Sequence, residues 1–562
     1  MQKKQTILVV ASLLVVVLSV TLAYFTAQII GKGKDVTINS ADLKIIFTDS
    51  DGSISGSNIE PGKWNVTKTF TIENKSNETY KYNIVIQDLV NTFVTEGYLQ
   101  YKITSTNGGY NMTEFKDVPK SEIATDTILA YSVSIPVGVT QSYTVEFKYA
   151  NDESIDQSDD MGKKISGKLF ITEGSKPTLL SQILKDNPTR SIRSNNNNGT
   201  NDFAIPLTAT TTGTLFTSTE SITGITETPK EVYYYAGNTT NNWVKFGKYQ
   251  NDLIKYRGYY STTDTSYYRD YSTMDECTSA SSYNINCTEY KYANAGDDIY
   301  WRIIRTNHDG SIRLLYVGTS HDTTGGNIGK SAFNTSFNSP KYVGYKYGED
   351  TSYDTIRNNT TESTIKTFID SWYQNNLSNY TKYLSTSAVY CNDRSLGTGQ
   401  IYNYTSSPSS KFNFAPYYRM DYDTDGATAN PSYNCTDIRD AFSVDNTNAK
   451  LDYPISLMTA DEIAFAGGVA FKKMNTPYAW FISNIAGTQV STSWWSLSPV
   501  YWNGSRANVW RWYSADAYLF NNFVSDTHAV RPAISLKSCI KYSTGDGTSE
   551  TPYEIVETDT GC

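Results

Sequence analysis

Residues 494–532 read WWSLSPVYWNGSRANVWRWYSADAYLFNNFVSDTHAVRP and hold five of the ten tryptophans of this 562-residue chain. Aromatic side chains alternate here with Asn, Arg and Asp, residue types that give a binding surface large contact area and directed hydrogen bonds. Unpaired polar groups are costly to bury, so we expect the polar members to reach the surface. We expect Trp494, Trp495 and Leu497 in the core.

The stretch predicts a recognition face, and the alternative is an aromatic-rich core of a β-domain. The predicted face comprises Tyr501, Trp502, Asn503, Arg506, Asn508, Trp510, Arg511, Trp512, Tyr513, Asp516, Tyr518, Asn521, Asn522 and Asp526. No pairing of nucleophile and base stands out in it. The three histidines, His308, His321 and His528, also lack a serine or cysteine in a nucleophile-elbow context. We therefore predict no enzyme activity.

The composition suits an extracellular protein of several domains. The chain is 39% hydrophobic and 19% charged, contains 45 tyrosines, and is rich in Asn, Ser and Thr. An AT-rich genome would produce the same bias. The net charge of −9 and the lack of a basic stripe give no reason to expect nucleic acid as a partner.

An apolar run from Ile7 to about Tyr24 follows Lys3 and Lys4. The run is long for a signal-peptide core and just long enough to span a membrane, with the lysines inside. We predict that residues 1–27 are an export signal or transmembrane anchor in the cytoplasmic membrane. Cleavage after Ala23 and retention as an anchor both stay open. The rest of the chain is expected at the cell surface, on the extracellular side.

Six cysteines occupy the C-terminal half, and no two of them form a CxxC pair. With so few histidines, a zinc site is disfavoured. An even number in an exported chain favours disulfides, with fifteen connectivities available. Nearest-neighbour pairing is the preferred one and joins Cys277 to Cys287, Cys391 to Cys435 and Cys539 to Cys562.

Residues 35–173 alternate with period two, as in Val66-Lys68-Phe70-Ile72, and turn clusters separate the runs. This pattern predicts an all-β antiparallel sandwich. The segment Thr21–Thr26, followed by Ile59-Glu-Pro-Gly62 and Ile72-Glu-Asn74, resembles the camelysin and biofilm-fibre-subunit group of exported Gram-positive proteins. The resemblance implies a jelly-roll-like sandwich and, in some members, fibre assembly by strand exchange.

Residues 174–230 contain an Asn-rich run at 194–200 and then a Thr/Ser-rich run. Few large apolar residues are present, so we predict a flexible or extended linker. One short helix is expected over Leu179–Asn187, before Pro188.

Residues 231–562 are predicted to form an α+β domain. Residues 299–305 and 311–317 flank Asn307–Gly310 as a β-hairpin. A helix is expected from Ser363 or Thr364 through Tyr373, with its apolar residues at helical spacing. A second helix begins with the capping box Thr459–Glu462 and stops at Gly467-Gly468.

This domain resembles an uncharacterised family of gut Firmicutes surface proteins, through the patterns at 301–305, 309–314, 457–463, 494–499 and 530–533. It also resembles the C-type-lectin fold, in the formylglycine-generating-enzyme-like branch that includes variable proteins of diversity-generating retroelements. That resemblance implies a fixed frame carrying a hypervariable exposed face. The frame would be Trp494, Trp495, Ser498, Pro499, Val509, Val524, Arg531 and Pro532. The predicted fold class is thus multidomain: a transmembrane helix, an all-β antiparallel sandwich and an α+β C-type-lectin-like domain.

The sequence departs from both functional branches of that fold. No cysteine lies between Cys435 and Cys539, so the close cysteine pair that holds copper in the enzymes is missing. The calcium-binding triplets of sugar-binding lectins do not occur. Asp421, Asp423 and Asp425 match the start of a calcium loop, but the twelfth position is Ser432. We expect turn chemistry there, with a calcium site as the weaker alternative, and no other cofactor.

The leading hypothesis is a non-catalytic cell-surface binding or adhesion protein whose ligand is an extracellular glycan or protein. The alternative is a structural surface or fibre subunit, in which the first domain assembles. A hydrolase or oxidoreductase built on the C-terminal domain, using His321 or His528, is the third.

Overall fold

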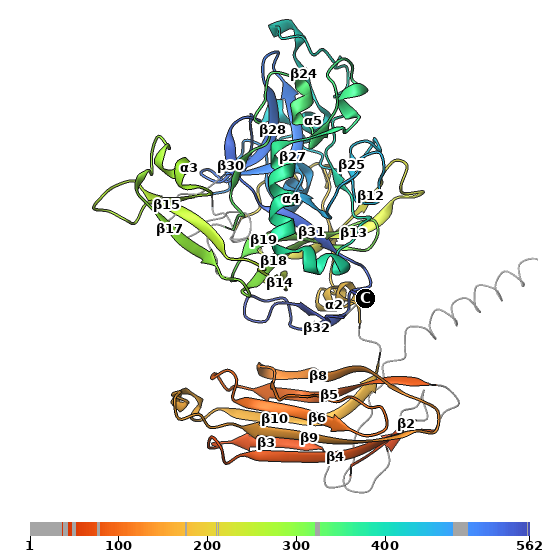
Figure 1. Cartoon of the computed structure of the whole chain (residues 1–562). Helices are drawn as coiled ribbons and strands as arrows, with labels where there is room; N and C mark the ends of the chain where they lie inside the picture. The colour runs from red at the N-terminus through yellow and green to blue at the C-terminus, as the bar shows by residue number, and fades with distance from the viewer. Residues whose placement is uncertain are drawn as a thin grey trace, which may run out of the picture. The chain divides into compact units, whose positions relative to one another are not determined.

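The computed structural model describes residues 36–37, 43–47, 52–75, 79–174, 177–208, 211, 213–320, 326–475, 493–558 and 560–562. The chain divides into two compact units, Met1–Lys176 and Pro177–Cys562. We call them the sandwich unit and the head unit (Figure 1).

The sandwich unit consists of two antiparallel sheets. The six-stranded sheet has the order β1 (Val36–Thr37), β2 (Leu43–Phe47), β4 (Asn65–Asn74), β9 (Thr140–Tyr149), β6 (Leu99–Ser105), β7 (Lys116–Asp117). The four-stranded sheet has the order β3 (Ser53–Ser57), β10 (Lys164–Glu173), β5 (Tyr80–Asn91), β8 (Ser121–Ile135).

One apolar core joins these two sheets. Phe70 and Ile72 of β4 and Ile84 and Ile86 of β5 are at most 1% exposed and belong to the same cluster. Their spacing of two residues places each pair on one face of its strand. The period-two pattern of the sequence therefore reports which face of each strand is buried.

The largest sheet of the head unit's described residues has eight strands. The order is β11 (Ser191–Ile192), β12 (Thr214–Glu220), β13 (Lys230–Ala236), β18 (Asp298–Thr306), β19 (Ile312–Gly318), β31 (Pro532–Leu536), β26 (Ile455–Leu457), and β14 (Trp243–Lys248) also pairs with β18. The predicted hairpin is confirmed as β18 and β19, which pair in antiparallel fashion.

A six-stranded sheet holds the tryptophan-rich stretch. Its order is β20 (Lys330–Ala332), β30 (Thr527–Ala529), β27 (Trp494–Trp502), β28 (Ala507–Tyr513), β29 (Tyr518–Phe523), with β24 (Phe412–Asn413) paired to β27. Side chains of both large sheets share one apolar core, to which Trp301 and Trp494 belong.

Three strands form an arm that stands out at the left of the head unit in Figure 1. They are β16 (Tyr268–Tyr271), β15 (Leu253–Tyr259) and β17 (Ile285–Ala293). The remaining strands form pairs: β21 (Lys346–Tyr347) with β22 (Thr361–Glu362), β23 (Tyr390–Cys391) with β25 (Ala441–Phe442), and β32 (Tyr542–Thr544) with β33 (Glu554–Ile555).

The helices of the described residues are short. The α-helices are α2 (Leu179–Asp186), α3 (Met274–Thr278), α4 (Thr364–Asn376), α5 (Ala415–Arg419) and α6 (Ala460–Ala466). The 3-10 helices are η1 (Ser158–Asp160), η2 (Pro340–Val343), η3 (Thr355–Arg357), η4 (Ser378–Tyr383), η5 (Pro408–Ser410) and η6 (Tyr422–Thr424).

Two helix predictions are confirmed in detail. The Ser363 hydroxyl caps α4 by accepting from the backbone N–H of Lys366 at 3.2 Å. The capping box of α6 is present, since Thr459 and Glu462 each accept from the other's backbone N–H. Gly467 ends α6 with φ of 120°, a conformation that favours glycine.

The predicted fold class is wrong and is corrected here. Strands dominate the regular structure of both units, so the head unit is a multi-sheet β-rich domain with a few short helices. Among the described residues, no helix is both long and apolar enough to cross a membrane. The helix predicted within residues 1–27 lies outside the described residues.

The boundary of the head unit also differs from the prediction. Residues 177–230, expected as a flexible linker, contribute α2, β11 and β12 to the head unit. Strand β12 pairs with β13 in seven consecutive register positions, from Thr214 with Ala236 to Glu220 with Lys230. Backbone pairing of a Thr/Ser-rich strand therefore replaces the expected spacer.

The predicted disulfide pairing is confirmed. Bonds join Cys277 to Cys287, Cys391 to Cys435 and Cys539 to Cys562. The first braces the arm, and the last connects the C-terminal residue to the segment after β31.

Candidate functional site

The central tryptophans of the predicted face belong to the core. Trp502 ends β27, and Trp510 and Trp512 lie on β28; each has 0% of its surface exposed. Trp494 stands opposite Trp512 in the register of β27 and β28. Side chains without exposed surface cannot contact an external ligand, so this part of the prediction is corrected in favour of the core alternative. Trp494 and Trp495 are buried as expected.

Several polar members of the predicted face are also buried, because they satisfy one another. The amide of Asn521 donates to the hydroxyl of Tyr501 at 2.9 Å and to Oδ1 of Asn508 at 3.2 Å. Tyr422 donates to Oδ1 of Asn521 at 3.1 Å. Asn508 donates onward to the backbone carbonyl of Arg506 at 3.0 Å. This network places polar groups inside without leaving them unpaired.

Other members shape turns or the sheet edge. Asn503 Oδ1 accepts from the backbone N–H of Arg506 at 2.7 Å, closing the β27–β28 turn. The exposed Arg506 guanidinium lies over the rings of Phe523, at 4.6 Å, and Phe337, at 5.3 Å. Asp516 pairs with Lys473 at 3.1 Å. Asn522 and Asp526 are partly buried.

One group of predicted residues keeps accessible surface. Arg511, Tyr513 and Tyr518, with Phe520, form what we call the aromatic patch at one end of β28 and β29. Tyr513 and Tyr518 are opposite in the register, as are Arg511 and Phe520. Ring centroids are 5.4 Å apart for Tyr513–Tyr518 and 5.8 Å for Tyr518–Phe520. All three rings are partly exposed.

Arg511 lies beneath these rings with 9% of its surface exposed. Its guanidinium is 4.8 Å from the ring centroid of Tyr513 and 5.6 Å from that of Phe520. Burial lowers the pKa of Arg511, and the neighbouring tyrosines and Asp526 oppose that shift. The patch thus combines a cation with aromatic faces, an arrangement found at binding surfaces.

His528 is held by packing against Trp495 and by a polar contact with Asn522. Its Nε2 lies 2.8 Å from the amide nitrogen of Asn522, and its ring packs on Trp495 at 4.6 Å. Burial, together with Arg511 and Lys330, holds the pKa of His528 well below its usual range. A neutral imidazole with a fixed amide partner is explained by packing. His321 lies outside the described residues.

A buried charge cluster was not foreseen from the sequence. Arg305 donates to Glu220 at 2.8 Å and to Glu462 at 2.7 Å, and Arg313 also donates to Glu462. Burial alone would raise the pKa of Glu220, but Arg305 and His308 outweigh it and hold it at about 2. The capping box identified Glu462 as a helix residue but gave no sign of its two arginine partners.

A second cluster lies beside the first. Arg419 donates to Asp461 at 2.8 and 3.0 Å and to Asp393 at 2.5 Å. A cavity of about 20 Å³ touches both clusters. That volume accommodates about one water molecule. These carboxylates and guanidiniums are already paired with one another, so the cluster holds the head unit together and offers no room for a substrate.

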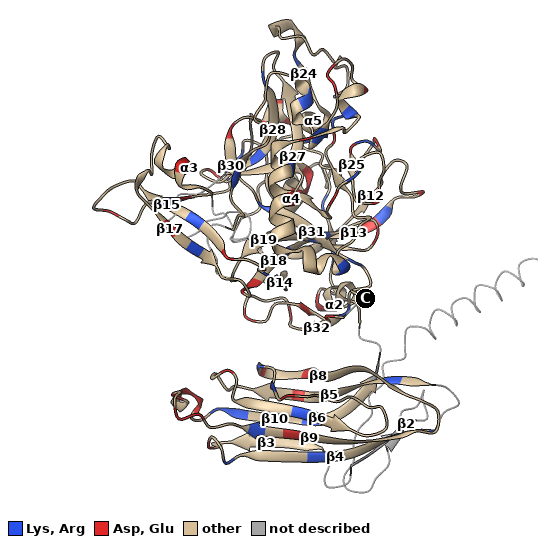
Figure 2. Ribbon diagram, in the orientation of Figure 1, with Lys and Arg blue, Asp and Glu red and all other residues tan. Residues whose placement is uncertain are grey.

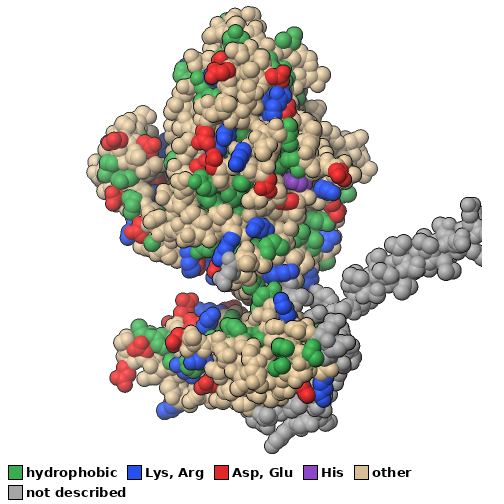
Figure 3. All heavy atoms as spheres, turned by 45° about the vertical axis from the view of Figure 1, so that its right-hand side comes forward, with side chains coloured by type: hydrophobic (Ala, Val, Ile, Leu, Met, Phe, Trp, Pro, Cys, Tyr) green, Lys and Arg blue, Asp and Glu red, His purple; other side chains and the backbone are tan. Residues whose placement is uncertain are grey.

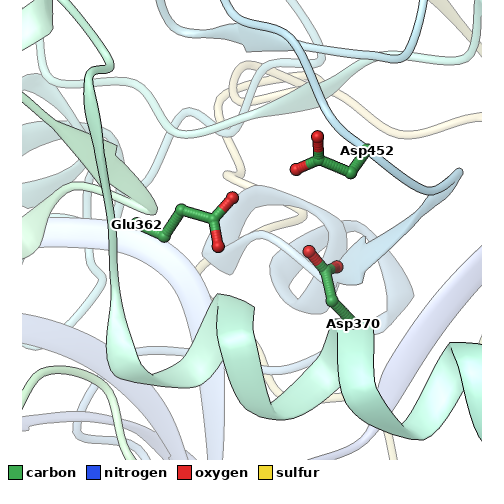
Figure 4. Close-up of side chains that lie close together, drawn as sticks. All are labelled: Glu362, Asp370 and Asp452. Atoms are coloured by element: carbon green, nitrogen blue, oxygen red, sulfur yellow. The ribbon is translucent and has the colours of Figure 1, made fainter.

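Figure 4 shows three carboxylates that lie close together, those of Glu362, Asp370 and Asp452. Within the described part of the chain, Glu362, Asp370 and Asp452 are the only three-residue group with ligand atoms within 4.8 Å of one another. The Nζ of Lys366 donates to them at 2.7, 2.5 and 2.7 Å respectively. Lys366 therefore occupies the position that a metal ion would take.

Within this group, the pKa of Asp370 is raised. Burial raises the pKa of Asp370 to about 6, and Glu362 and Asp452 add to the shift while Lys366 opposes it. The group is a structural ion cluster at the start of α4.

The weak calcium-loop candidate does not bring its three carboxylates within 4.8 Å of one another. Asp421 accepts from the backbone N–H of Thr428 at 2.7 Å and from the hydroxyl of Thr424. Asp423 accepts from the hydroxyl of Tyr417 at 2.5 Å. Asp425 adopts a left-handed conformation with φ of 53°. The motif forms a turn, in agreement with the turn chemistry expected from its sequence.

Charged residues are otherwise interspersed. Figure 2 shows acidic and basic residues mixed over both units, and Figure 3 shows hydrophobic side chains in separate areas of the displayed face. Among the described residues in these views, charge alone therefore singles out no binding surface.

Comparison with known proteins adds no family assignment. No protein-family model and no curated protein matches the chain. A solved structure titled "AvmM Catalyzes Macrocyclization in Alchivemycin A Biosynthesis" matches 23% of this chain and 92% of its own, with 10% identity and a TM-score of 0.12. The class 5 fimbriae chaperone CfaA matches 47% of this chain and 91% of its own, with 11% identity and a TM-score of 0.08.

Proposed function

We propose that the chain is a non-catalytic binding protein of the cell surface, whose head unit contacts an extracellular glycan or protein through the aromatic patch. The observation that supports it is the placement of Tyr513, Tyr518 and Phe520 as partly exposed rings around Arg511. Rings on adjacent strands of a sheet offer a rigid contact area at low entropic cost.

The disulfides agree with an extracellular location. All three bonds lie in the head unit. Such bonds persist in oxidising surroundings and are rare in the reducing cytosol.

The chemistry of the described polar groups favours binding over catalysis. Glu220 and Glu462 are each held by an arginine, and His528 is held neutral next to Asn522. These contacts explain why the groups are buried, and they leave the aromatic patch as the accessible chemistry of the tryptophan-rich stretch.

The test uses the purified full-length chain on glycan and surface-protein arrays. Tyr518→Ser/Phe520→Ser removes two partly exposed rings of the aromatic patch. Tyr404→Ser is the control, since Tyr404 is 46% exposed on another loop of the head unit. Circular dichroism verifies that each variant folds. A ligand bound by wild type and by the control, and bound at least ten-fold more weakly by the double variant, supports the proposal. Equal binding by all three contradicts it.

A structural or fibre role for the sandwich unit is the alternative. Strand β8 is one of the two edge strands of the four-stranded sheet, and its Ile123 is 72% exposed. An unpaired strand edge is a template for another strand. Ordered polymers formed by the sandwich unit alone, seen by electron microscopy, would favour this role over ligand binding.

A further inference from the structure

The arm of the head unit carries exposed tyrosines that are not part of the predicted binding face. Residues 260–267 connect the end of β15 to the start of β16 and have the sequence YSTTDTSY. We call this connection the tip. Tyr260 is 63% exposed and Tyr267 is 51% exposed. Exposed apolar side chains that cluster mark interaction sites, whereas single scattered ones are common.

The two tyrosines lie on one face of the hairpin. The backbone N–H of Tyr260 donates to the carbonyl of Tyr267 at 3.1 Å, so the residues stand directly opposite each other. Directly opposite residues in an antiparallel pair point to the same face. Tyr283 extends this face, with its ring centroid 5.3 Å from that of Tyr260.

The arm that carries the tip is rigid. Arg257 forms two hydrogen bonds to Asp270, at 2.8 and 3.1 Å. The same guanidinium lies between the rings of Tyr268, at 3.7 Å, and Tyr290, at 4.4 Å. These contacts tie β15, β16 and β17 into one unit, so that little conformational entropy is lost when the tip binds.

The loop closed by the Cys277–Cys287 disulfide packs on β15 next to the tip. Cys277 and Cys287 close a loop whose Tyr283 carbonyl packs on Gly258. A Cβ at position 258 would lie 2.0 Å from that carbonyl oxygen, so only glycine permits this approach.

The base of the arm is fixed to the body of the head unit. Lys255 is 3% exposed, donates to the carbonyl of Asn327 at 2.9 Å and lies 3.6 Å from the ring centroid of Tyr292. The hydroxyl of Ser272 accepts from the backbone N–H of Lys330 at 2.8 Å. The tip is therefore held at a set position relative to the body.

The chemistry of the tip favours an uncharged partner. Between positions 258 and 268 the one charged residue is Asp264, and its Oδ1 accepts from the backbone N–H of Ser266 at 2.9 Å. Residues 258–268 contain no lysine or arginine to attract phosphate or an acidic polymer, and the guanidinium of the adjacent Arg269 lies 4.8 Å from the ring centroid of Tyr283. Five serine and threonine residues lie between the two tyrosines in the sequence, and each hydroxyl can donate and accept hydrogen bonds.

The available area favours a sugar chain over a protein. Two fully covered tyrosine side chains bury roughly 300–500 Å². A stable protein interface takes about 800 Å² from each partner. We infer that the tip binds a neutral polysaccharide, whose C–H faces stack on Tyr260 and Tyr267 while its hydroxyls bond to the tip hydroxyls. This site goes beyond the proposed function, because it shares no residue with the aromatic patch.

The test is affinity electrophoresis of the folded full-length chain through gels that contain dextran, mannan, xylan or mixed-linkage β-glucan, with polygalacturonate as the acidic comparison. Tyr260→Ser/Tyr267→Ser removes the rings, and Tyr260→Phe/Tyr267→Phe keeps them. Tyr404→Ser again controls for loss of an exposed tyrosine. We expect retardation by at least one neutral polymer, at least ten-fold weaker binding by the serine pair, and binding within about three-fold of wild type by the phenylalanine pair.

Three results would overturn the inference: no retardation by any neutral polymer, retardation that the serine pair retains, or dependence on Tyr260 and Tyr267 for binding to array proteins alone. The variant Tyr518→Ser/Phe520→Ser separates the two proposals. Retardation that this patch variant loses and the serine pair retains overturns the arm site and leaves the proposed function standing. The converse supports the arm site and leaves the aromatic patch to be decided by the array screen.

Discussion

Arg305 donates through Nε to Oε1 of Glu462 at 2.7 Å, which joins β18 of the eight-stranded sheet to the first turn of α6. Both side chains are at most 4% exposed. Glu462 also accepts from the backbone N–H of Thr459 at 2.9 Å and from Arg313. One carboxylate therefore caps a helix and pairs with guanidiniums from two strands.

We predict that Glu462→Gln destabilises the head unit by about 3–5 kcal/mol, because it leaves the buried Arg313 without an acidic partner among the described residues and leaves Arg305 paired with Glu220 alone. Urea unfolding followed by tryptophan fluorescence reports this loss, because several tryptophans lie in the head-unit core: Trp301, Trp372, Trp494, Trp495, Trp502, Trp510 and Trp512. The matched control is Glu349→Gln, whose side chain is 79% exposed and 3.6 Å from Lys341. A midpoint for Glu462→Gln equal to that of the control would contradict the structural role.

We predict a pH-dependent effect at Asp370. Its pKa of about 6 in the folded chain exceeds the value of roughly 3.9 expected when unfolded. Folding therefore favours the protonated carboxyl, and the stability it contributes is full below about pH 4 and lost as the pH rises through 6. Asp370→Asn removes this loss, so its stability relative to wild type should increase by up to roughly 3 kcal/mol between pH 4 and pH 6.5.

Denaturation at several pH values measures that difference, which is insensitive to any constant cost of losing the bond to Lys366. Asp516→Asn serves as the comparison, because Asp516 has a partly exposed ion pair with Lys473. A difference between Asp370→Asn and wild type that stays level from pH 4 to pH 6.5 would rule out the raised pKa.

Features set by local sequence could be predicted, whereas burial of the tryptophan-rich stretch could not. Caps such as Ser363 and the disulfide between Cys277 and Cys287 depend on nearby residues. The position of Asn521 depends on Tyr501 and Asn508, which lie 20 and 13 residues away. A polar residue looks exposed in sequence until such partners are known.

The same reason explains the error over residues 174–230. Strand β12 has few large apolar side chains, Leu215 and Phe216 among them, so its composition resembles a spacer. Its stability comes from the backbone bonds to β13, and composition carries no information about a pairing partner.

We predict that Trp510 and Tyr518 respond differently to truncation. Trp510 has 0% exposure and lies in the head-unit core, so Trp510→Ala should cost about 3–5 kcal/mol in the free energy of unfolding. Its indole N–H has no hydrogen-bond partner in the described residues, so Trp510→Phe should cost clearly less. Tyr518→Ala, at a partly exposed ring, should stay within about 1 kcal/mol of wild type.

Thermal and urea denaturation of the three variants decide between core and surface for this stretch. If Trp510→Ala retained wild-type stability, the tryptophan would be available for ligand contact after all, and the original prediction of a continuous face would return.

We predict that two disulfides act on different parts of the head unit. The Cys277–Cys287 bond closes a sequence separation of 10 within the arm, whereas Cys391–Cys435 closes one of 44 beside buried Ile222 and Ala441. Replacing the first pair with serine should speed hydrogen exchange at residues 274–290 and leave the body of the head unit protected. Replacing the second should lower the stability of the whole head unit by about 2–4 kcal/mol, since the longer loop regains more entropy on unfolding. Hydrogen exchange read by mass spectrometry separates the two, and protection lost throughout the head unit on removing the Cys277–Cys287 bond would show that the arm and the body unfold together.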